Sequence, residues 1–309
     1  MVIASLARSR SSLAIGNVTG SAISNILGAF SLGLLFSTDD GSSVFDTSSK
    51  IYSAILLLLT TFVAPVVYFP RKDLWRPCGG VLIAVFVLYV ISIAWAIGRG
   101  RLTAPEDSDS EDSGSDDDSY TSPTQPPESE DDSTSSQSST RTPLLRRAPV
   151  PDRSSHSLLY HALYLLLGFL SICLASYILS HAASTITTQL GISDVLFGVV
   201  ILAFATTLPE KFVAVFSGYR GHMGILVANT VGSNIFLLSL CTGVILVDTN
   251  GDFDSGSVNM SELAVMWGAT VVFACTIWFG AGWTKPIGVL MLVAYFVFLA
   301  LEFTTIRGI

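Results

Sequence analysis

Long apolar segments dominate this sequence and restrict its fold more than any other feature. A stretch of about 20 apolar residues is long enough to cross a bilayer as a helix. A lipid-facing segment must pair its own backbone N–H and C=O groups, which a helix achieves by itself. We therefore predict an all-α transmembrane protein with eight helices, over residues 13–36, 51–69, 79–98, 157–180, 192–217, 222–247, 261–280 and 286–305.

The segment at residues 100–155 interrupts this pattern. It is acidic and rich in serine, whereas 50% of the whole chain is hydrophobic and only 13% is charged. Of the 24 Asp and Glu residues, 13 lie between Glu106 and Asp152, so the net charge of −8 belongs largely to this segment. Such a composition cannot bury enough apolar surface to fold. We predict three regions, namely three helices in 1–99, a disordered cytoplasmic linker in 100–155 and five helices in 156–309.

The sequence contains an internal repeat. Residues 1–25 align without a gap on residues 213–237, and the matches centre on the pattern N-x-x-G-S. Extended upstream, the alignment places the counterpart of Glu210 three residues before Met1. We therefore expect a parent architecture of two five-helix repeats, of which the first repeat lacks its first two helices here. Because five is an odd number, the second repeat enters the membrane inverted.

The stretch AFATTLPEK, which ends at Lys211, places a proline and a carboxylate inside a predicted span. Pro209 removes a backbone hydrogen bond, and Glu210 adds a charge that costs about 2.5–3.5 kcal/mol at mid-bilayer on insertion scales. Inverted-repeat transporters bind ions near mid-bilayer where helices break. The oxygens of Thr206, Thr207 and Glu210 suit Ca²⁺ or Na⁺. The alternative is a structural kink whose glutamate is hydrogen-bonded to a neighbouring helix.

These residues resemble the calcium/cation antiporter superfamily, particularly the membrane region of its sodium/calcium exchangers. The stretch GISDVLFGVVILAFATTLPEKFVAVFSGYRGHMGILVANTVGSNIFLL is similar to the family's alpha-repeat along its whole length. The hallmarks of that repeat are (A/G)-x-(T/S)-(T/S)-x-P-E and N-x-x-G-S-N. GNVTGSAISNIL, residues 16–27, resembles the second hallmark in the first repeat. The resemblance covers all the predicted helices and implies an inverted-repeat antiporter fold.

The resemblance also implies a cation site at six positions. It implies alternating-access exchange of Ca²⁺ against Na⁺ or H⁺, with these cations as substrates, no cofactor and no enzymatic activity. Glu210 matches the acidic ligand of the second repeat. The other five residues are Thr206 and Thr207 beside it, Ser21 and Ser233 of the two G-S steps, and Asn25, which matches an Asn or Asp four residues after the serine.

Two departures from the family pattern leave the activity open. Leu237 stands at the second-repeat position equivalent to Asn25, and the first-repeat glutamate is absent. A Ca²⁺ site takes 6–8 oxygens and benefits from more than one carboxylate. The chain could therefore be an antiporter, a transport-inactive relative that acts as a partner or regulator of an intact exchanger, or an incomplete gene product.

This chain is predicted to lie in a lipid bilayer. We expect an integral multi-pass protein of a vacuolar or other organellar membrane rather than of the plasma membrane. The negative charge is concentrated in one segment and gives no indication of nucleic-acid binding. A homo-oligomer and a hetero-oligomer are both compatible with the sequence.

Overall fold

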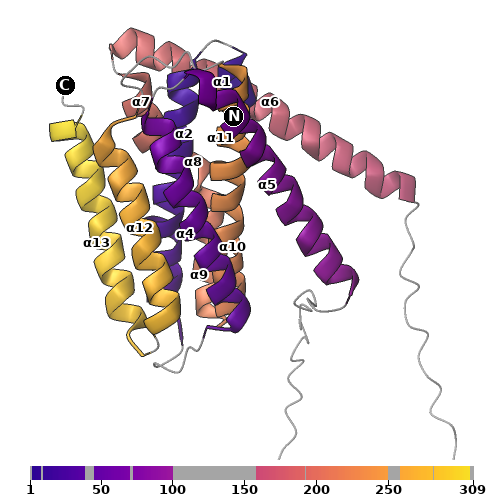
Figure 1. Cartoon of the computed structure of the whole chain (residues 1–309), viewed down its shortest axis with the longest axis vertical. Coiled ribbons are helices and arrows are strands. Elements are labelled where there is room, and N and C mark those ends of the chain that lie inside the picture. The colour runs from indigo at the N-terminus through magenta and orange to yellow at the C-terminus, as the bar shows by residue number, and fades with distance from the viewer. Residues whose placement is uncertain are drawn as a thin grey trace, which may run out of the picture.

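The structure is a computed structural model, and it describes residues 2–7, 10–38, 45–69, 72–99, 158–191, 193–249, 258–280 and 282–306. Within these ranges the chain forms helices and no strand, packed as a bundle (Figure 1). The predicted fold class is therefore confirmed. The segment predicted to be a disordered linker, residues 100–155, lies outside the described ranges.

Helices cover all the predicted spans, but the helix predicted at 157–180 continues to Leu190 and the one predicted at 79–98 begins at Lys72. Seven are long and apolar enough to cross a membrane, and a bent helix pair makes an eighth span among the described residues. The elements are α1 (Val2–Leu6), α2 (Ser11–Ile23), η1 (Ser24–Phe30), α3 (Ser31–Leu35), α4 (Thr47–Tyr68), α5 (Lys72–Gly98), α6 (Leu158–Leu190), α7 (Asp194–Leu196), η2 (Phe197–Leu202), α8 (Ala203–Thr206), α9 (Leu208–Tyr219), α10 (Met223–Ile235), η3 (Phe236–Cys241), α11 (Thr242–Asp248), α12 (Met260–Phe279), α13 (Thr284–Leu301) and η4 (Glu302–Ile306), where η denotes a π-helical turn.

The repeat in the sequence is also a repeat of structure. The bounds of α2 and α10 differ by 212 residues at both ends, and so do the first residues of η1 and η3 and of α5 and α13. The helix α2 runs away from the end of the bundle that holds α1, whereas α10 and α11 run toward that end (Figure 1). The two repeats are therefore related by inversion, which is the arrangement expected from an odd number of helices.

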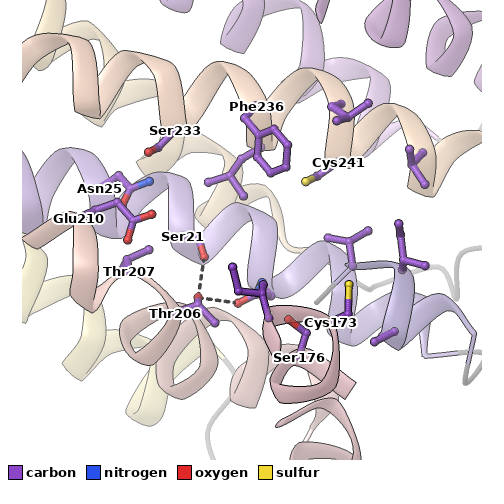
Figure 2. Close-up of a pocket in the computed structure, with 18 of the residues that line it drawn as sticks. Ser21, Asn25, Cys173, Ser176, Thr206, Thr207, Glu210, Ser233, Phe236 and Cys241 are labelled. Carbon is purple, nitrogen blue, oxygen red and sulfur yellow. Dashed lines mark hydrogen bonds between the residues drawn. The ribbon is translucent and has the colours of Figure 1, made fainter. Parts of the chain in front are cut away.

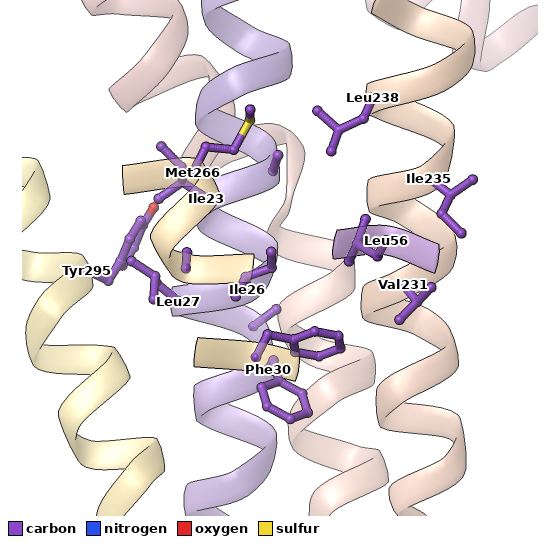
Figure 3. Packing of buried hydrophobic residues seen from close by; sticks show 14 of the residues in the cluster. Ile23, Ile26, Leu27, Phe30, Leu56, Val231, Ile235, Leu238, Met266 and Tyr295 are labelled. Atoms are coloured by element: carbon purple, nitrogen blue, oxygen red, sulfur yellow. The ribbon is translucent and has the colours of Figure 1, made fainter. Parts of the chain in front are cut away.

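The central span of the bundle is formed by α2, η1 and α3. In the 18-residue apolar window of Ser11–Leu35, 89% of the residues are buried, because they face neighbouring helices all round. Phe30 packs edge-on against Phe273 of α12, with the ring centroids 4.7 Å apart. Figure 3 shows Phe30, Ile26 and Leu27 packed among side chains of the surrounding helices. By contrast, α5 and α6 turn most of their apolar side chains outward, as expected of helices that face lipid.

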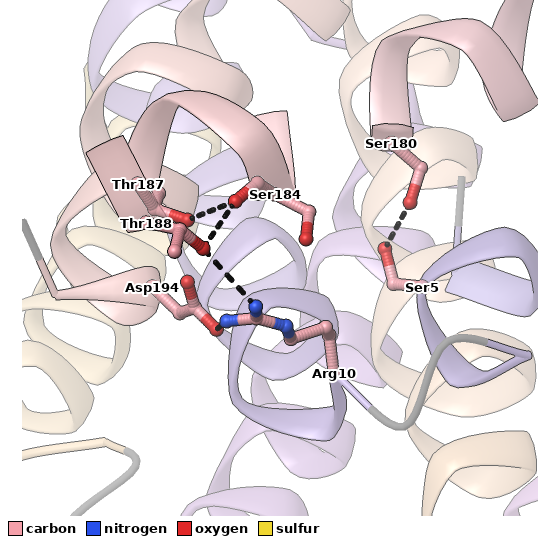
Figure 4. Close-up of polar contacts among 7 residues, drawn as sticks. All are labelled: Ser5, Arg10, Ser180, Ser184, Thr187, Thr188 and Asp194. Carbon is pink, nitrogen blue, oxygen red and sulfur yellow. Dashed lines mark hydrogen bonds and ion pairs between the residues drawn. The ribbon is translucent and has the colours of Figure 1, made fainter. Parts of the chain in front are cut away.

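A polar contact ties the repeats together at the end of the bundle that holds α1. Arg10, just before α2, donates to Asp194 at the start of α7 over 2.7 Å. The same guanidinium donates to Thr188 of α6 over 3.3 Å (Figure 4). The hydroxyl oxygens of Ser5 in α1 and Ser180 in α6 lie 3.3 Å apart. The contacts join segments that are more than 170 residues apart in the sequence.

Candidate cation site

The span predicted to contain a proline break is broken at Thr207. The segments Asp194–Thr206 and Leu208–Tyr219 meet at 46°. Thr207 has φ −100° and ψ 11°, which is not helical, and Pro209 lies in the first turn of α9. Pro209 has no N–H to offer to the carbonyl four residues earlier, so the helix cannot continue unbroken through this point. At the break Thr207 is buried, whereas Leu208 and Pro209 are exposed.

A cavity of about 980 Å³, here called the central cavity, lies beside this break. Its lining comes from α1, α2, η1, α6, the break itself, and the run from α10 to α11. Figure 2 shows polar side chains toward one end of it and Cys173 and Cys241 toward the other. All six residues predicted as cation ligands line the central cavity, namely Ser21, Asn25, Thr206, Thr207, Glu210 and Ser233.

The first repeat contributes a row of polar side chains from one helix face. Asn17, Ser21 and Asn25 follow one another at intervals of four residues, so they lie on one face of α2 and η1. All three line the central cavity and are at most 4% exposed. Asn17 was not among the residues predicted from the sequence. The signal for it was present, because Asn17 is identical to its repeat counterpart Asn229.

The two repeats meet across this polar row. The Thr206 hydroxyl donates to the carbonyl of Leu202 over 2.9 Å, which leaves its oxygen facing the first repeat. That oxygen lies 3.4 Å from the side-chain oxygen of Asn17 and 3.5 Å from the hydroxyl of Ser21 (Figure 2). Three oxygens from two repeats are therefore gathered in one place.

Two buried oxygens of the central cavity have no hydrogen-bond partner among the described residues. They are Oε2 of Glu210 and Oδ1 of Asn25. An unpaired buried oxygen costs about 1–3 kcal/mol, and more when it carries charge. A bound cation would supply the missing partner, and carboxylate and amide oxygens are ligands that hard cations prefer. The donor set of the cavity therefore fits a cation.

Thr207 differs from the other predicted ligands. Its hydroxyl accepts a hydrogen bond from the Lys211 ammonium over 2.5 Å and lies 2.9 Å from the hydroxyl of Ser24. It also donates to the carbonyl of Ala203 over 2.7 Å. Thr207 lines the central cavity, but its hydroxyl is already engaged on the side of Ser24 and Lys211. Its role as a ligand stays a prediction.

The cavity is poor in negative charge. No group of three or more His, Cys, Asp and Glu side chains that could hold a metal is found among the described residues. Among the described residues, Glu210 is the only carboxylate in the cavity lining. Leu237 lines the cavity with an alkyl group at the position equivalent to Asn25. The described side chains supply oxygens chiefly as hydroxyls and amides.

The glycines of the two N-x-x-G-S patterns lie in different surroundings. A Cβ atom on Gly20 would lie 2.2 Å from the carbonyl oxygen of Val199, because α2 and η2 cross closely there. A Cβ atom on Gly232 would meet only the hydroxyl of Tyr89, at 3.9 Å. Gly232 lines the central cavity instead.

An inverted pair of repeats, with a helix break and a cation-suited cavity between them, defines an inverted-repeat membrane transporter. The family model for "Sodium/calcium exchanger protein" matches residues 1–95 and 160–304. The chain belongs to this family of cation exchangers.

Named relatives agree with this family. The chain is 31% identical over 103 residues to "Putative antiporter CaxA" of Alkalimonas amylolytica, a match that covers 33% of this chain and 32% of that protein. It is 35% identical over 82 residues to "Sodium/calcium exchanger MaX1" of Methanosarcina acetivorans, which covers 26% of this chain and 23% of that protein. It is 28% identical over 169 residues to human "Sodium/potassium/calcium exchanger 1", a match that covers 50% of this chain and 15% of that protein. The matched parts thus span a third or less of these relatives.

The fold has a solved counterpart. The structure of native YfkE superposes with a TM-score of 0.57 at 16% sequence identity. The superposition covers 96% of this chain and 79% of that chain. At this level of identity the likeness concerns the fold alone.

Proposed function

We propose that this chain forms the cation-binding core of an antiporter that exchanges Ca²⁺ against Na⁺ or H⁺. The observation that carries the proposal is the unpartnered Oε2 of Glu210 at a helix break, beside the unpartnered Oδ1 of Asn25. A carboxylate inside a membrane span is costly and is retained where it binds an ion. Membership of the exchanger family and the named antiporters among its relatives support the same activity.

In the proposed mechanism, Glu210 binds either Ca²⁺ or the counter-cation. Glu210 cannot bind both cations with full affinity at the same time, so each cation displaces the other. Ser21 and Asn25 from the first repeat and Thr206 from the second add neutral oxygens. Because the ligands come from both repeats, rocking of one repeat against the other would expose the bound ion to alternate sides of the membrane.

The test is Ca²⁺ uptake into vesicles that contain the purified protein, driven by a Na⁺ gradient or a pH gradient. Glu210→Gln keeps the shape of the side chain and removes its charge, so we expect uptake to fall to the level of empty vesicles. Asp248→Asn is the matched control. Asp248 is exposed at the end of α11 and outside the central cavity, so this variant should retain uptake. Uptake that persists unchanged in Glu210→Gln would contradict the proposal.

Leu237 favours a second function, that of a transport-inactive partner or regulator of an intact exchanger. An alkyl group in the central cavity contributes no oxygen where Asn25 contributes one in the other repeat. A chain of this kind would show no uptake under either gradient. It would instead change the uptake of an intact exchanger when the two are placed in the same vesicles. Ca²⁺ uptake into vesicles that contain this chain and no other exchanger would support the antiporter and contradict the regulator.

The organellar membrane expected from the sequence is part of the same proposal. An antiporter in a vacuolar membrane would load Ca²⁺ into the organelle against H⁺ or Na⁺. Fluorescence microscopy of the tagged chain, together with organelle markers, tests this expectation. Label confined to the plasma membrane would contradict it.

A further inference from the structure

The side chain of Lys211 is buried next to the central cavity. It belongs to the first turn of α9 and is 7% exposed. Lys211 follows Glu210 directly, but one helical step turns the side chain by about 100°, so that it does not line the cavity. Gly28 of η1 leaves room for it, because a Cβ atom there would lie 3.3 Å from the Cε atom of Lys211.

Oxygens surround the ammonium of Lys211. Its Nζ atom lies 2.8 Å from the hydroxyl oxygen of Ser24, 2.5 Å from that of Thr207 and 3.4 Å from the Thr207 carbonyl. An ammonium has three N–H donors, and each one has an acceptor here. The hydroxyl of Tyr295 lies 2.9 Å from that of Ser24 and extends the cluster to α13. The acceptors come from both repeats.

No carboxylate of the described residues forms an ion pair with this ammonium. The remaining contact is the ring of Phe204, whose centroid lies 4.8 Å from Nζ. Hydroxyl and carbonyl oxygens together with an aromatic face are the surroundings of a bound monovalent cation. The ammonium therefore lies where a mobile cation could otherwise be held.

Thr207 connects this position to the candidate site. It lines the central cavity, as Glu210 does, and its hydroxyl is bonded to the Lys211 ammonium. A fixed positive charge separated from the cavity by one side chain opposes the binding of any cation at Glu210. The opposition is stronger for a divalent ion than for a monovalent ion, because the Coulomb energy scales with the product of the charges.

We propose that the Lys211 ammonium is a tethered monovalent cation that determines the ion selectivity of this site. It fills the position lined by Ser24 and Thr207, so that a mobile cation cannot enter it, and it lowers the affinity of Glu210 for divalent ions. The inference rests on the proposed function, because it assigns Glu210 as the cation ligand. A purely structural role, in which Lys211 only joins α9 to η1, makes different predictions.

Calcium binding by calorimetry on the purified full chain gives the first test. Lys211→Met keeps much of the side-chain length and removes the charge, so we expect Ca²⁺ to bind about tenfold more tightly or better. Lys211→Arg keeps the charge and should stay within about threefold of the parent. A folded Lys211→Met protein whose Ca²⁺ affinity equals that of the parent would overturn the proposal. A structural role predicts that equality together with a lower unfolding temperature.

The second test needs no Ca²⁺. Lys211→Ala leaves the oxygens of Ser24 and Thr207 without their donor. We expect NaCl, KCl or methylammonium chloride to raise the unfolding temperature of this variant above its value in choline chloride of equal concentration. The rise should be smaller in the parent and in Lys211→Met, where these cations can bind only at Glu210. A Lys211→Ala protein whose unfolding temperature responds to the three small cations no more than that of the parent would overturn the proposal.

The two proposals fail in distinguishable ways. If the parent chain binds no Ca²⁺ and Glu210→Gln changes nothing, the proposed function is wrong, while the salt response of Lys211→Ala still decides the role of Lys211. If Glu210→Gln abolishes Ca²⁺ binding and Lys211→Met leaves it unchanged, the proposed function stands. In that case the proposal that Lys211 acts as a tethered cation is wrong. If Lys211→Ala does not fold, the Ca²⁺ affinity of Lys211→Met decides.

Discussion

Gly20 faces the carbonyl oxygen of Val199 so closely that a Cβ atom on Gly20 would lie only 2.2 Å from that oxygen. This contact brings α2 of the first repeat against η2 of the second and places Ser21, the next residue, in the central cavity. Small residues permit such close helix crossings within membranes. The position of the first-repeat ligands therefore depends on residue 20 being a glycine, which has no side chain.

We predict that Gly20→Ala destabilises the protein strongly and that Gly232→Ala does not. The methyl group on residue 20 would collide with backbone, which cannot move aside as a flexible side chain can, at a cost of about 1–3 kcal/mol or more. Gly232 has open space in the central cavity. Thermal unfolding of both variants in detergent measures the difference. Equal unfolding temperatures for the two variants would show that α2 and η2 do not cross as closely as described.

Asn17 should contribute to cation affinity although it lies outside the hallmark serine step. Its side-chain oxygen lies 3.4 Å from the Thr206 hydroxyl, and its side chain lines the central cavity. We expect Asn17→Leu, which keeps the volume and removes the oxygen, to weaken Ca²⁺ binding about tenfold, as the loss of one charge-assisted contact would. Calorimetry measures the affinity. An unchanged affinity in a folded variant would remove Asn17 from the site.

Leu237→Asp should strengthen Ca²⁺ binding by about tenfold or more, because it adds a carboxylate to a cavity in which Glu210 is the one carboxylate among the described lining residues. Leu237→Asn is the control, since it adds an oxygen without charge and should give a smaller gain. Calorimetry on the purified variants compares the two. A folded Leu237→Asp protein that binds no better than the parent would show that Leu237 does not limit the site.

The ion pair between Arg10 and Asp194 should stabilise the contact between the repeats only modestly. The two side chains are 35% and 14% exposed, and pairs open to water contribute about 0.2–1 kcal/mol. We expect a double-mutant cycle with Arg10→Gln and Asp194→Asn to give a coupling energy in that range, which decreases as salt is added. A coupling energy that is insensitive to salt would indicate a pair much better shielded from water than its exposure suggests.

The sequence alone determined the helices, their order and their repetition. A lipid-facing backbone must satisfy its own hydrogen bonds, so apolar length alone identifies spans, and a proline without an N–H identifies the break beside Glu210. The offset of 212 read from the N-x-x-G-S patterns recurs in the bounds of α2 and α10. These features are local, and each depends on residues that are neighbours in the chain. The family also followed from such local patterns.

Which side chains meet depends on how the helices pack in three dimensions. The contact of Asn17 with Thr206 joins residues 189 positions apart, and the oxygens around Lys211 come from Ser24 as well as from the adjoining Thr207. The glycines Gly20 and Gly232 occupy equivalent positions in the sequence pattern but pack differently. Such contacts depend on how whole helices pack against one another, which local propensity and hydropathy do not encode, because they describe a helix without its neighbours.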